Sequence, residues 1–343
     1  MGYRITHPTS RISNVVVLVQ EVSLMQCVLV SLDSRWANYS SKRSLSLAHQ
    51  IGDFVYHRRF LPWCGNVRYG YILSSRHTHQ SFSRNMAIEY LAALPQMMPP
   101  PNVKVLIAGA CGGLGFALTE AALAASIEVV GLDRQEDLRE IALPVSAHGI
   151  AFDATNEDSV AFAAVSNIWL QIDHVVNFVG LTKERVLLED LAMAEWDEIV
   201  DGCLKSAFLI ARRAAPLLRR GKNPTLVNTS STFGAAIRHD GYCPYATTKA
   251  GVINLTRALA LEWAPNIRVN AIAPRIINTA FLRGGTGRPA KPIGVDQAAV
   301  LASIPLQRLG EASDITGLAL FLSSPAVGFI TGQTVHANGG TWS

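Results

Sequence analysis

Short apolar runs alternate with longer alanine-rich or amphipathic stretches through the chain after residue 100. The runs that predict strands span residues 103–108, 128–132, 174–178, 225–228 and 267–272. The stretches that predict helices span residues 116–126, 196–219 and 245–263. This alternation predicts a single α/β domain, in which a doubly wound parallel sheet carries helices on both faces. Ligands of such sheets bind at the carboxyl ends of the strands.

A glycine-rich turn joins the first predicted strand to the first predicted helix. Residues 109–115 read Gly-Ala-Cys-Gly-Gly-Leu-Gly, a spacing of Gly-x-x-x-Gly-x-Gly. Glycines at such a turn let the backbone approach a pyrophosphate, whose charge is met by the N–H groups and dipole of the helix start. The turn therefore predicts a dinucleotide site.

The second predicted strand is followed by Asp133, an acidic residue at the position that contacts ribose in dinucleotide-binding folds. A carboxylate there accepts hydrogen bonds from the adenosine ribose hydroxyls and repels a 2′-phosphate. Arg134 is the opposing signal, because an arginine just past the strand could serve that phosphate. The strand-end position of Asp133 favours NAD as the cofactor over NADP.

Tyr245 and Lys249 lie four positions apart in a predicted helix, so both face the same side. A phenol normally ionises near pH ~10, and a fixed cation beside it favours the phenolate. Ser231 lies upstream and could donate to a substrate oxygen without titrating. The three residues predict an acid/base site, although a Tyr/Lys pair alone is also common on solvated helix faces.

Taken together, these motifs resemble the short-chain dehydrogenase/reductase family over nearly all of residues 101–343. The glycine turn fits the family's Thr-Gly-x-x-x-Gly-x-Gly with Ala108 in place of the threonine, and residues 268–274, 331–333 and 338–340 also fit. The resemblance implies that Ser231, Tyr245 and Lys249 are catalytic. The cofactor-binding residues that it implies are Gly109, Gly113, Leu114, Gly115, Asp133, Asp153, Asn177, Gly180, Tyr245, Lys249 and Thr279.

Three departures from the family pattern lie close to the expected chemistry. Cys203 occupies the position of the usual catalytic asparagine, which places the proton relay through Lys249 in question, because a thiol is a weak donor and acceptor. Arg275 replaces a glycine and could narrow the pocket or attract an anionic substrate. The segment from Ser231 to Tyr245 is one position longer than the commonest spacing, and its residues Arg238, His239, Asp240 and Tyr242 could shape an unusual pocket.

The function that follows from the resemblance is NAD(H)-dependent interconversion of a secondary alcohol and a ketone. The C-terminal stretch resembles 3-oxoacyl-carrier-protein reductases, so a 3-hydroxyacyl or 3-oxoacyl substrate is possible, although those reductases usually use NADP. The Gly/Pro-rich segment 283–293 is expected to form a lid. The alternative is a non-catalytic NAD-binding or scaffold protein that retains the fold, a reading motivated by Cys203.

Charge divides the chain into two regions at about residue 100. The chain has 30 Lys and Arg against 26 Asp and Glu. Residues 1–100 hold ten of these basic residues and four of the acidic ones, so the excess belongs to this extension. The domain at 101–343 thus gives no basis for nucleic-acid binding. We expect residues 1–100 to be a poorly structured extension, not a second enzyme domain.

The extension admits three further interpretations. Its apolar run at 15–32 contains Glu21, which argues against a membrane span because a carboxylate at bilayer depth is costly. Targeting is possible but no clear cleavage site follows the run. Translation from upstream of the true start is the preferred reading, because Met98 lies just before three prolines and the first strand.

Five scattered cysteines without a Cys-x-x-Cys pair indicate reduced thiols and a cytoplasmic protein. The histidines show no metal-ligand spacing, so no metal is expected. The family resemblance also implies a symmetric homo-oligomer, a dimer or homotetramer formed through the helices predicted at 196–219 and 245–263.

Overall fold

The computed structural model describes residues 15–20, 26–31, 54–64, 67–75, 97–285 and 297–341. The chain forms two compact units, Met1–Leu94 and Pro95–Ser343. In the first unit β1 (Val15–Gln20) pairs antiparallel with β2 (Gln26–Ser31), and β3 (Phe54–Cys64) pairs antiparallel with β4 (Val67–Ser75). Most of the predicted extension and most of the predicted lid lie outside the described residues. None of the helices that the structure describes is long and apolar enough to cross a membrane.

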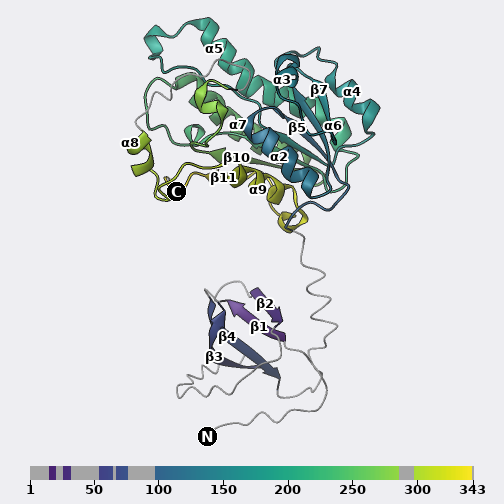
Figure 1. Cartoon of the computed structure of the whole chain (residues 1–343), viewed down its shortest axis with the longest axis vertical. Helices are drawn as coiled ribbons and strands as arrows, with labels where there is room; N and C mark the ends of the chain where they lie inside the picture. The colour runs from purple at the N-terminus through teal and green to yellow at the C-terminus, as the bar shows by residue number, and fades with distance from the viewer. Residues whose placement is uncertain are drawn as a thin grey trace. The chain divides into compact units, whose positions relative to one another are not determined.

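The second unit is built on a seven-stranded parallel sheet (Figure 1). The strands lie in the order β11-β10-β9-β8-β5-β6-β7, which confirms the predicted doubly wound α/β fold. Their bounds are β5 Lys104–Ala108, β6 Glu128–Asp133, β7 Ala147–Ala151, β8 His174–Asn177, β9 Thr225–Thr229, β10 Arg268–Pro274 and β11 Thr334–Ala337. The strand order reverses between β5 and β8, and such reversals open a crevice for ligands.

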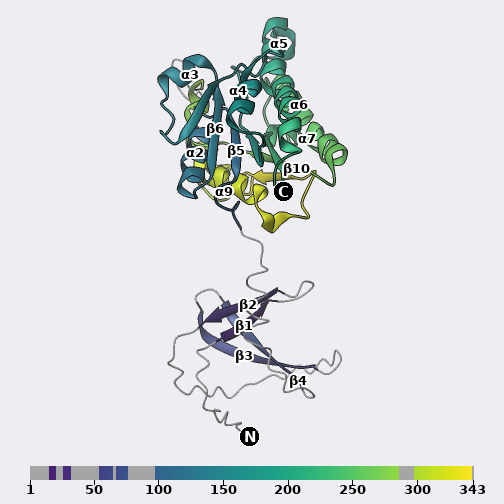
Figure 2. The ribbon, with the colours of Figure 1, turned by 90° about the vertical axis from the view of Figure 1, so that its right-hand side faces the viewer.

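Helices cover both faces of this sheet (Figure 2). One face packs against α4 (Ala161–Ile168), α6 (Ser206–Leu218) and α7 (Cys243–Trp263). The other packs against α2 (Gly113–Ala124) and α9 (Ala312–Ser323). The remaining helices are α3 Gln135–Glu140, α5 Met193–Val200 and α8 Gln297–Ala302, with short helical turns at η1 Leu188–Asp190, η3 Thr232–Gly234, η4 Ala280–Arg283 and η5 Pro325–Val327.

The central strand β5 shows why the sheet is buried on both sides. Successive side chains of a strand point to opposite faces. Leu106 and Ala108 belong to the core under α6 and α7, whereas Val105 and Ile107 belong to the core under α2 and α9. A continuous apolar run is therefore required here, instead of the alternating pattern of a half-exposed strand.

All five predicted strands are present, with ends shifted by at most two residues. The sequence pattern did not predict β7 or β11, because β7 is largely solvent-facing and β11 is only partly buried. The helix predicted over 196–219 is divided into α5, the π-helical turn η2 (Asp201–Lys205) and α6. That turn carries Cys203, and π-bulges occur frequently at functional sites.

The start of α2 lies directly against the preceding glycine turn. A Cβ on Gly115 would lie 2.0 Å from the carbonyl oxygen of Gly109 and 2.7 Å from the Cα of Ala110. Both neighbours are backbone atoms and cannot rotate away. Gly109 itself has a φ of +80°, a conformation that glycine adopts without strain. The two glycines are therefore fixed by backbone geometry.

We predict that Gly115→Ala lowers the free energy of unfolding by about 1–3 kcal/mol or more, since its Cβ forces the backbone of the turn apart. Gly317 in α9 provides the matched control, because a Cβ there meets nothing within 4 Å. Gly317→Ala should stabilise the protein by about 0.5–1 kcal/mol through helix propensity. Denaturant titration of both variants measures the difference, and equal stabilities would contradict the close approach.

Candidate functional site

The parallel register brings the predicted site residues to one edge of the sheet. Ala108 pairs with Leu132 on one side and with Asn177 on the other. Asn177 pairs with Asn228, and Thr229 pairs with Ile272. Because these pairs lie at the carboxyl ends of neighbouring strands, the loops that follow them share one edge. The glycine turn, Asp133, Ser231 and the segment after β10 all begin there.

The glycine turn forms a cradle that larger residues would fill. A Cβ on Gly109 would lie 3.2 Å from the backbone carbon of Phe178, and one on Gly113 would lie 2.8 Å from the Cβ of Thr279. Leu114, the second residue of α2, is partly buried against the core on that face. The N–H groups of the turn and of the start of α2 would suit a pyrophosphate, and Thr279 lies against Gly113 at this helix start.

Asp133 ends β6 and lies beside the glycine turn. Its Oδ2 accepts a hydrogen bond from the backbone N–H of Cys111 at 2.7 Å, and its Oδ1 accepts one from Arg134 N–H at 2.8 Å. Burial raises the pKa of this carboxyl, while the two backbone hydrogen bonds act to lower it. The carboxylate is thus held in a fixed orientation next to the turn, where a ribose is expected.

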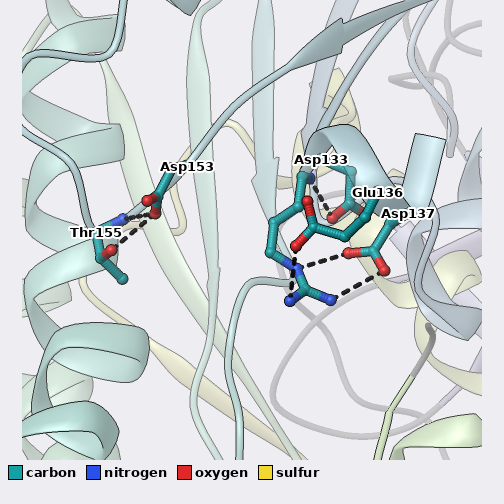
Figure 3. A network of polar contacts seen from close by, with 6 residues as sticks. Asp133, Glu136, Asp137, Asp153 and Thr155 are labelled. Carbon is teal, nitrogen blue, oxygen red and sulfur yellow. Dashed lines mark hydrogen bonds and ion pairs between the residues drawn. The ribbon is translucent and has the colours of Figure 1, made fainter. Parts of the chain in front are cut away.

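Arg134 is held by carboxylates of its own helical turn. Its Nε donates to Asp137 Oδ2 at 2.7 Å and its Nη2 donates to Asp137 Oδ1 at 2.9 Å, a bidentate pair. Nη1 also lies 3.2 Å from Glu136 Oε1. Figure 3 shows Glu136 and Asp137 on this guanidinium, while Asp133 accepts from the backbone N–H of the same arginine. Three carboxylates against one cation leave the local charge negative.

Glu136 and Asp137 were not among the residues singled out from the sequence. The signal was available, because Arg134 and Asp137 have the i, i+3 spacing of helical ion pairs. Asp137 is only 3% exposed, whereas the Arg134 side chain is 39% exposed, so the carboxylate is the buried partner of this pair. The guanidinium of Arg134 is thus already paired within its own helical turn.

Asp153 and Asn177 occupy the outer and inner parts of the crevice. Asp153 is exposed, and its Oδ1 accepts hydrogen bonds from the N–H and hydroxyl of Thr155 at 2.9 and 2.7 Å (Figure 3). Asn177 is buried, and its Oδ1 accepts from Val179 N–H at 3.0 Å. Asn177 therefore holds the turn leading to Gly180.

The three predicted catalytic residues lie near one another. Ser231 caps η3 and is buried, and Lys249 is buried on α7. Lys249 Nζ donates to the carbonyl oxygen of Thr229 at 2.9 Å and lies 5.7 Å from the ring centroid of Tyr245. Ser231 lies close enough to Tyr245 that hydrogen bonding from its hydroxyl acts to lower the pKa of the phenol. A Cβ on Gly180 would lie 3.1 Å from Nζ, so this glycine leaves space for the ammonium.

Burial dominates the acid/base properties of this cluster. Desolvation raises the pKa of Tyr245 above that of an ordinary phenol, and only the hydrogen bond from Ser231 acts in the opposite direction. The sequence had predicted that Lys249 lowers the pKa of Tyr245. Desolvation also lowers the pKa of Lys249 itself. Removal from water is thus the largest influence on the pKa of both groups.

Cys203 is buried in the π-helical turn and contacts the loop that follows Gly180. Its Sγ donates to the carbonyl oxygen of Leu181 at 3.1 Å and accepts from the N–H of Leu181 at 3.5 Å. A Cβ on Gly180 would lie 3.9 Å from the same sulfur. The thiol therefore serves as both donor and acceptor to one backbone residue, next to the place where Lys249 Nζ lies.

The longer loop between Ser231 and Tyr245 lies beside the tyrosine. Phe233 packs on Tyr242 and Tyr245, with ring centroids 5.0 and 6.3 Å away. Asp240 forms an ion pair with Arg185, whose guanidinium lies 6.0 Å from the ring centroid of Tyr242. His239 lies at the rim, 6.4 Å from Phe233. These contacts enclose the Tyr245 side of the crevice.

No group of three His, Cys, Asp or Glu side chains able to hold a metal ion occurs within the described part of the chain. The candidate site consists of a glycine-turn backbone, the Asp133 carboxylate, and the cluster of Ser231, Tyr245 and Lys249. Such an arrangement can bind a dinucleotide and exchange a proton with a substrate oxygen.

Comparison with known proteins gives matches over this same region. A family model described as Enoyl-(Acyl carrier protein) reductase matches residues 109–341. The 3-oxoacyl-(acyl-carrier-protein) reductase FabG of Aquifex aeolicus (strain VF5) is 32% identical over 254 residues, which cover 68% of this chain and 95% of that protein. The reductase of the same name from Vibrio cholerae is 30% identical over 244 residues, covering 69% of this chain and 96% of the relative.

Solved structures of similar sequence share the fold. The aldohexose dehydrogenase of Thermoplasma acidophilum has a TM-score of 0.63 at 27% identity, covering 70% of this chain and 94% of that chain. The 3-oxoacyl-(acyl-carrier protein) reductase of Brucella melitensis ATCC 23457 has a TM-score of 0.62 at 30% identity, covering 74% of this chain and 96% of that chain.

We predict that Cys203→Ala destabilises the protein by about 1–3 kcal/mol and lowers kcat, because it leaves the N–H and carbonyl of Leu181 without their partner. Cys203→Asn should retain more stability, since an amide also supplies a donor and an acceptor. Cys243→Ala is the control, because Cys243 is exposed. Denaturant titration and steady-state rates check this. A Cys203→Ala variant as stable as the wild type would show that the two sulfur bonds contribute nothing.

Proposed function

Since the chain belongs to the short-chain dehydrogenase/reductase family, we propose that it transfers hydride between NAD(H) and a carbon substrate, interconverting a secondary alcohol and a ketone. The observation that carries this proposal is the cluster of Ser231, Tyr245 and Lys249 beside a glycine cradle that a Cβ would fill. The coarser statement, an oxidoreductase of this family that uses a nicotinamide cofactor, follows from the family itself.

Each member of the cluster has a distinct role in this proposal. Tyr245 donates its proton to the carbonyl oxygen during reduction and removes the alcohol proton during oxidation. Ser231 donates a hydrogen bond to the same substrate oxygen. Lys249 lies close enough to stabilise the phenolate and would hold the nicotinamide ribose. When bound, the cofactor supplies the hydride acceptor or donor.

The raised pKa of Tyr245 determines which form of the phenol is present at neutral pH. A phenol whose pKa lies above its usual value remains protonated at neutral pH, which suits proton donation to a ketone. Oxidation of an alcohol requires the phenolate, so it depends on Lys249 and on the cationic oxidised nicotinamide to lower that pKa. The protonated form of Tyr245 thus suits the reduction step, whereas the equilibrium between alcohol and ketone is set by the reactants and not by this pKa.

The proposed preference for NAD rests on the carboxylates around Arg134. A 2′-phosphate on the adenosine ribose would meet Asp133, Glu136 and Asp137, while the only nearby guanidinium among the described residues is already bound to two of them. A 2′-phosphate could bind the Arg134 guanidinium only by displacing the bidentate carboxylate of Asp137, and this displacement costs free energy. The ribose hydroxyls of NAD can bind without displacing that carboxylate.

The proposed substrate class is a 3-hydroxyacyl or 3-oxoacyl compound. Its support is the printed activity of two similar proteins, the 3-oxoacyl-(acyl-carrier-protein) reductases of Aquifex aeolicus and Vibrio cholerae. We also propose a symmetric homo-oligomer. Phe208 on α6 and Leu261 on α7 are exposed apolar side chains on the two helices expected to form its interface.

We predict that Tyr245→Phe lowers kcat by at least about 100-fold, because general acid/base catalysis is worth this much, while NAD affinity changes little. A panel of secondary alcohols and 3-oxoacyl thioesters, followed through nicotinamide absorbance, provides the assay. Retention of most of the rate would remove Tyr245 from the mechanism. A wild-type protein that binds NAD but turns over none of the panel would instead favour the non-catalytic alternative.

Cofactor preference has its own test. Wild-type protein should bind NAD more tightly than NADP, and the double variant Glu136→Gln/Asp137→Asn should improve NADP affinity at least about tenfold, or about 1.4 kcal/mol, by releasing Arg134. Glu140→Gln is the control, an exposed carboxylate on the same helix α3. Fluorescence titration with each nucleotide measures both affinities. Tighter binding of NADP by the wild type would refute the preference.

A further inference from the structure

A cavity of about 300 Å³ lies beyond the carboxyl ends of β10 and β11. Its wall comes from the segment after β10, the residues that follow α8, and the turn after β11. The residues that line it include Arg275, Ile277, Ile304, Arg308, Asp314 and His336. The hollow beside Tyr245 is far smaller, about 10 Å³. The larger cavity is thus next to Arg275, which replaces the glycine that the family usually has at this position.

Arg275 is held in the wall of this cavity. Its Nη2 donates to Ser303 Oγ at 2.8 Å, and its backbone N–H donates to the carbonyl oxygen of Ala337 at 3.1 Å. Its Nε is buried and has no hydrogen-bond partner among the described residues. A buried N–H donor without an acceptor is unfavourable, so this nitrogen is a position where an acceptor from a ligand would be stabilising.

The positive charge of Arg275 is not compensated by its neighbours among the described residues. Arg308, the other arginine in the wall, is bound through both nitrogens by Asp314 at 2.6 and 2.9 Å. Within the part of the chain that the structure describes, no carboxylate forms an ion pair with Arg275. Arg238 lies close enough that its charge, together with burial, lowers the pKa of Arg275. An arginine remains charged at neutral pH, so the wall carries a net positive charge.

The rest of the cavity and its place in the fold narrow the class of ligand. Ile277 and Ile304 are buried apolar residues of the wall, which suit a short hydrocarbon chain. The segment from Arg275 continues to Thr279, which contacts the glycine turn at Gly113. Arg238 comes from the loop between Ser231 and Tyr245 and donates to the carbonyl oxygen of Thr341. The cavity therefore adjoins the segments that form the candidate catalytic site.

We propose that this cavity binds a small organic carboxylate, whose oxygens accept hydrogen bonds from the Arg275 guanidinium while its apolar chain packs against Ile277 and Ile304. The assignment of this carboxylate to one end of the alcohol or ketone substrate rests on the proposed function. Binding of the anion in this cavity does not depend on the proposed function. The same chemistry would also accommodate a carboxylate that is not the substrate.

Calorimetric titration with butyrate tests the site, and butyramide is the neutral ligand of matched shape. Wild-type protein should bind butyrate, and Arg275→Met should weaken that binding at least tenfold while leaving butyramide unchanged. Arg275→Lys keeps a charge but lacks Nε, so it should fall between the two. Arg219→Met is the control, because Arg219 is an exposed arginine at the end of α6. Thermal unfolding of each variant verifies that it is folded.

Butyrate binding that is equal in wild type and Arg275→Met, or absent from both, would overturn the proposal. Rates with 3-hydroxybutyrate and butan-2-ol then separate the two sources of the carboxylate. A loss of kcat/KM for the hydroxy acid alone in Arg275→Met identifies the substrate's own carboxylate. Unchanged rates for both alcohols, with butyrate binding lost, assign the site to a separate anion. If the wild-type protein turns over neither alcohol, that result counts against the proposed function. It does not count against the anion site, because calorimetry tests that site independently.

Discussion

The close approach of helix α2 to the backbone of Gly109 is the constraint on which the crevice depends. Any side chain at Gly115 would meet backbone atoms of the turn, so the helix can start this near the strand only because that Cβ is missing. The same turn places the N–H of Cys111 on Asp133 and the surface of Gly113 against Thr279. One steric condition therefore sets the positions of the Asp133 carboxylate and of the segment after β10.

At the other end of the crevice, a buried ammonium organises the residues around it. Lys249 is removed from water, and a charged group in such surroundings needs compensating polar partners. The carbonyl of Thr229 supplies one, the absence of a side chain at Gly180 leaves room, and the Cys203 thiol fixes the adjoining Leu181. Cys203 thus links the π-helical turn to this loop.

The sequence was sufficient for those features that depend on local pattern. The apolar runs predicted β5, β8, β9 and β10, and the glycine spacing predicted the cradle. The sequence was insufficient for those features that burial or long-range packing determines. The raised pKa of Tyr245 arises from desolvation that no spacing reveals, and the π-helical turn at Cys203 interrupts a continuous helical pattern. The ion pair of Arg134 with Asp137 was not predicted, although the spacing permitted it.

Neither of the two apolar cores beside the sheet contains a predicted catalytic residue, and among the described residues Leu114 is the only predicted cofactor residue that packs against either core. The candidate site lies at one edge of the sheet, in loops and at the start of α7, whereas cohesion comes from side chains in the layers above and below. Mutations of the exposed residues 237–240, in the loop after Ser231, can thus accumulate without repacking the interior. In evolutionary terms, the scaffold can be inherited unchanged while the residues that contact the substrate diverge.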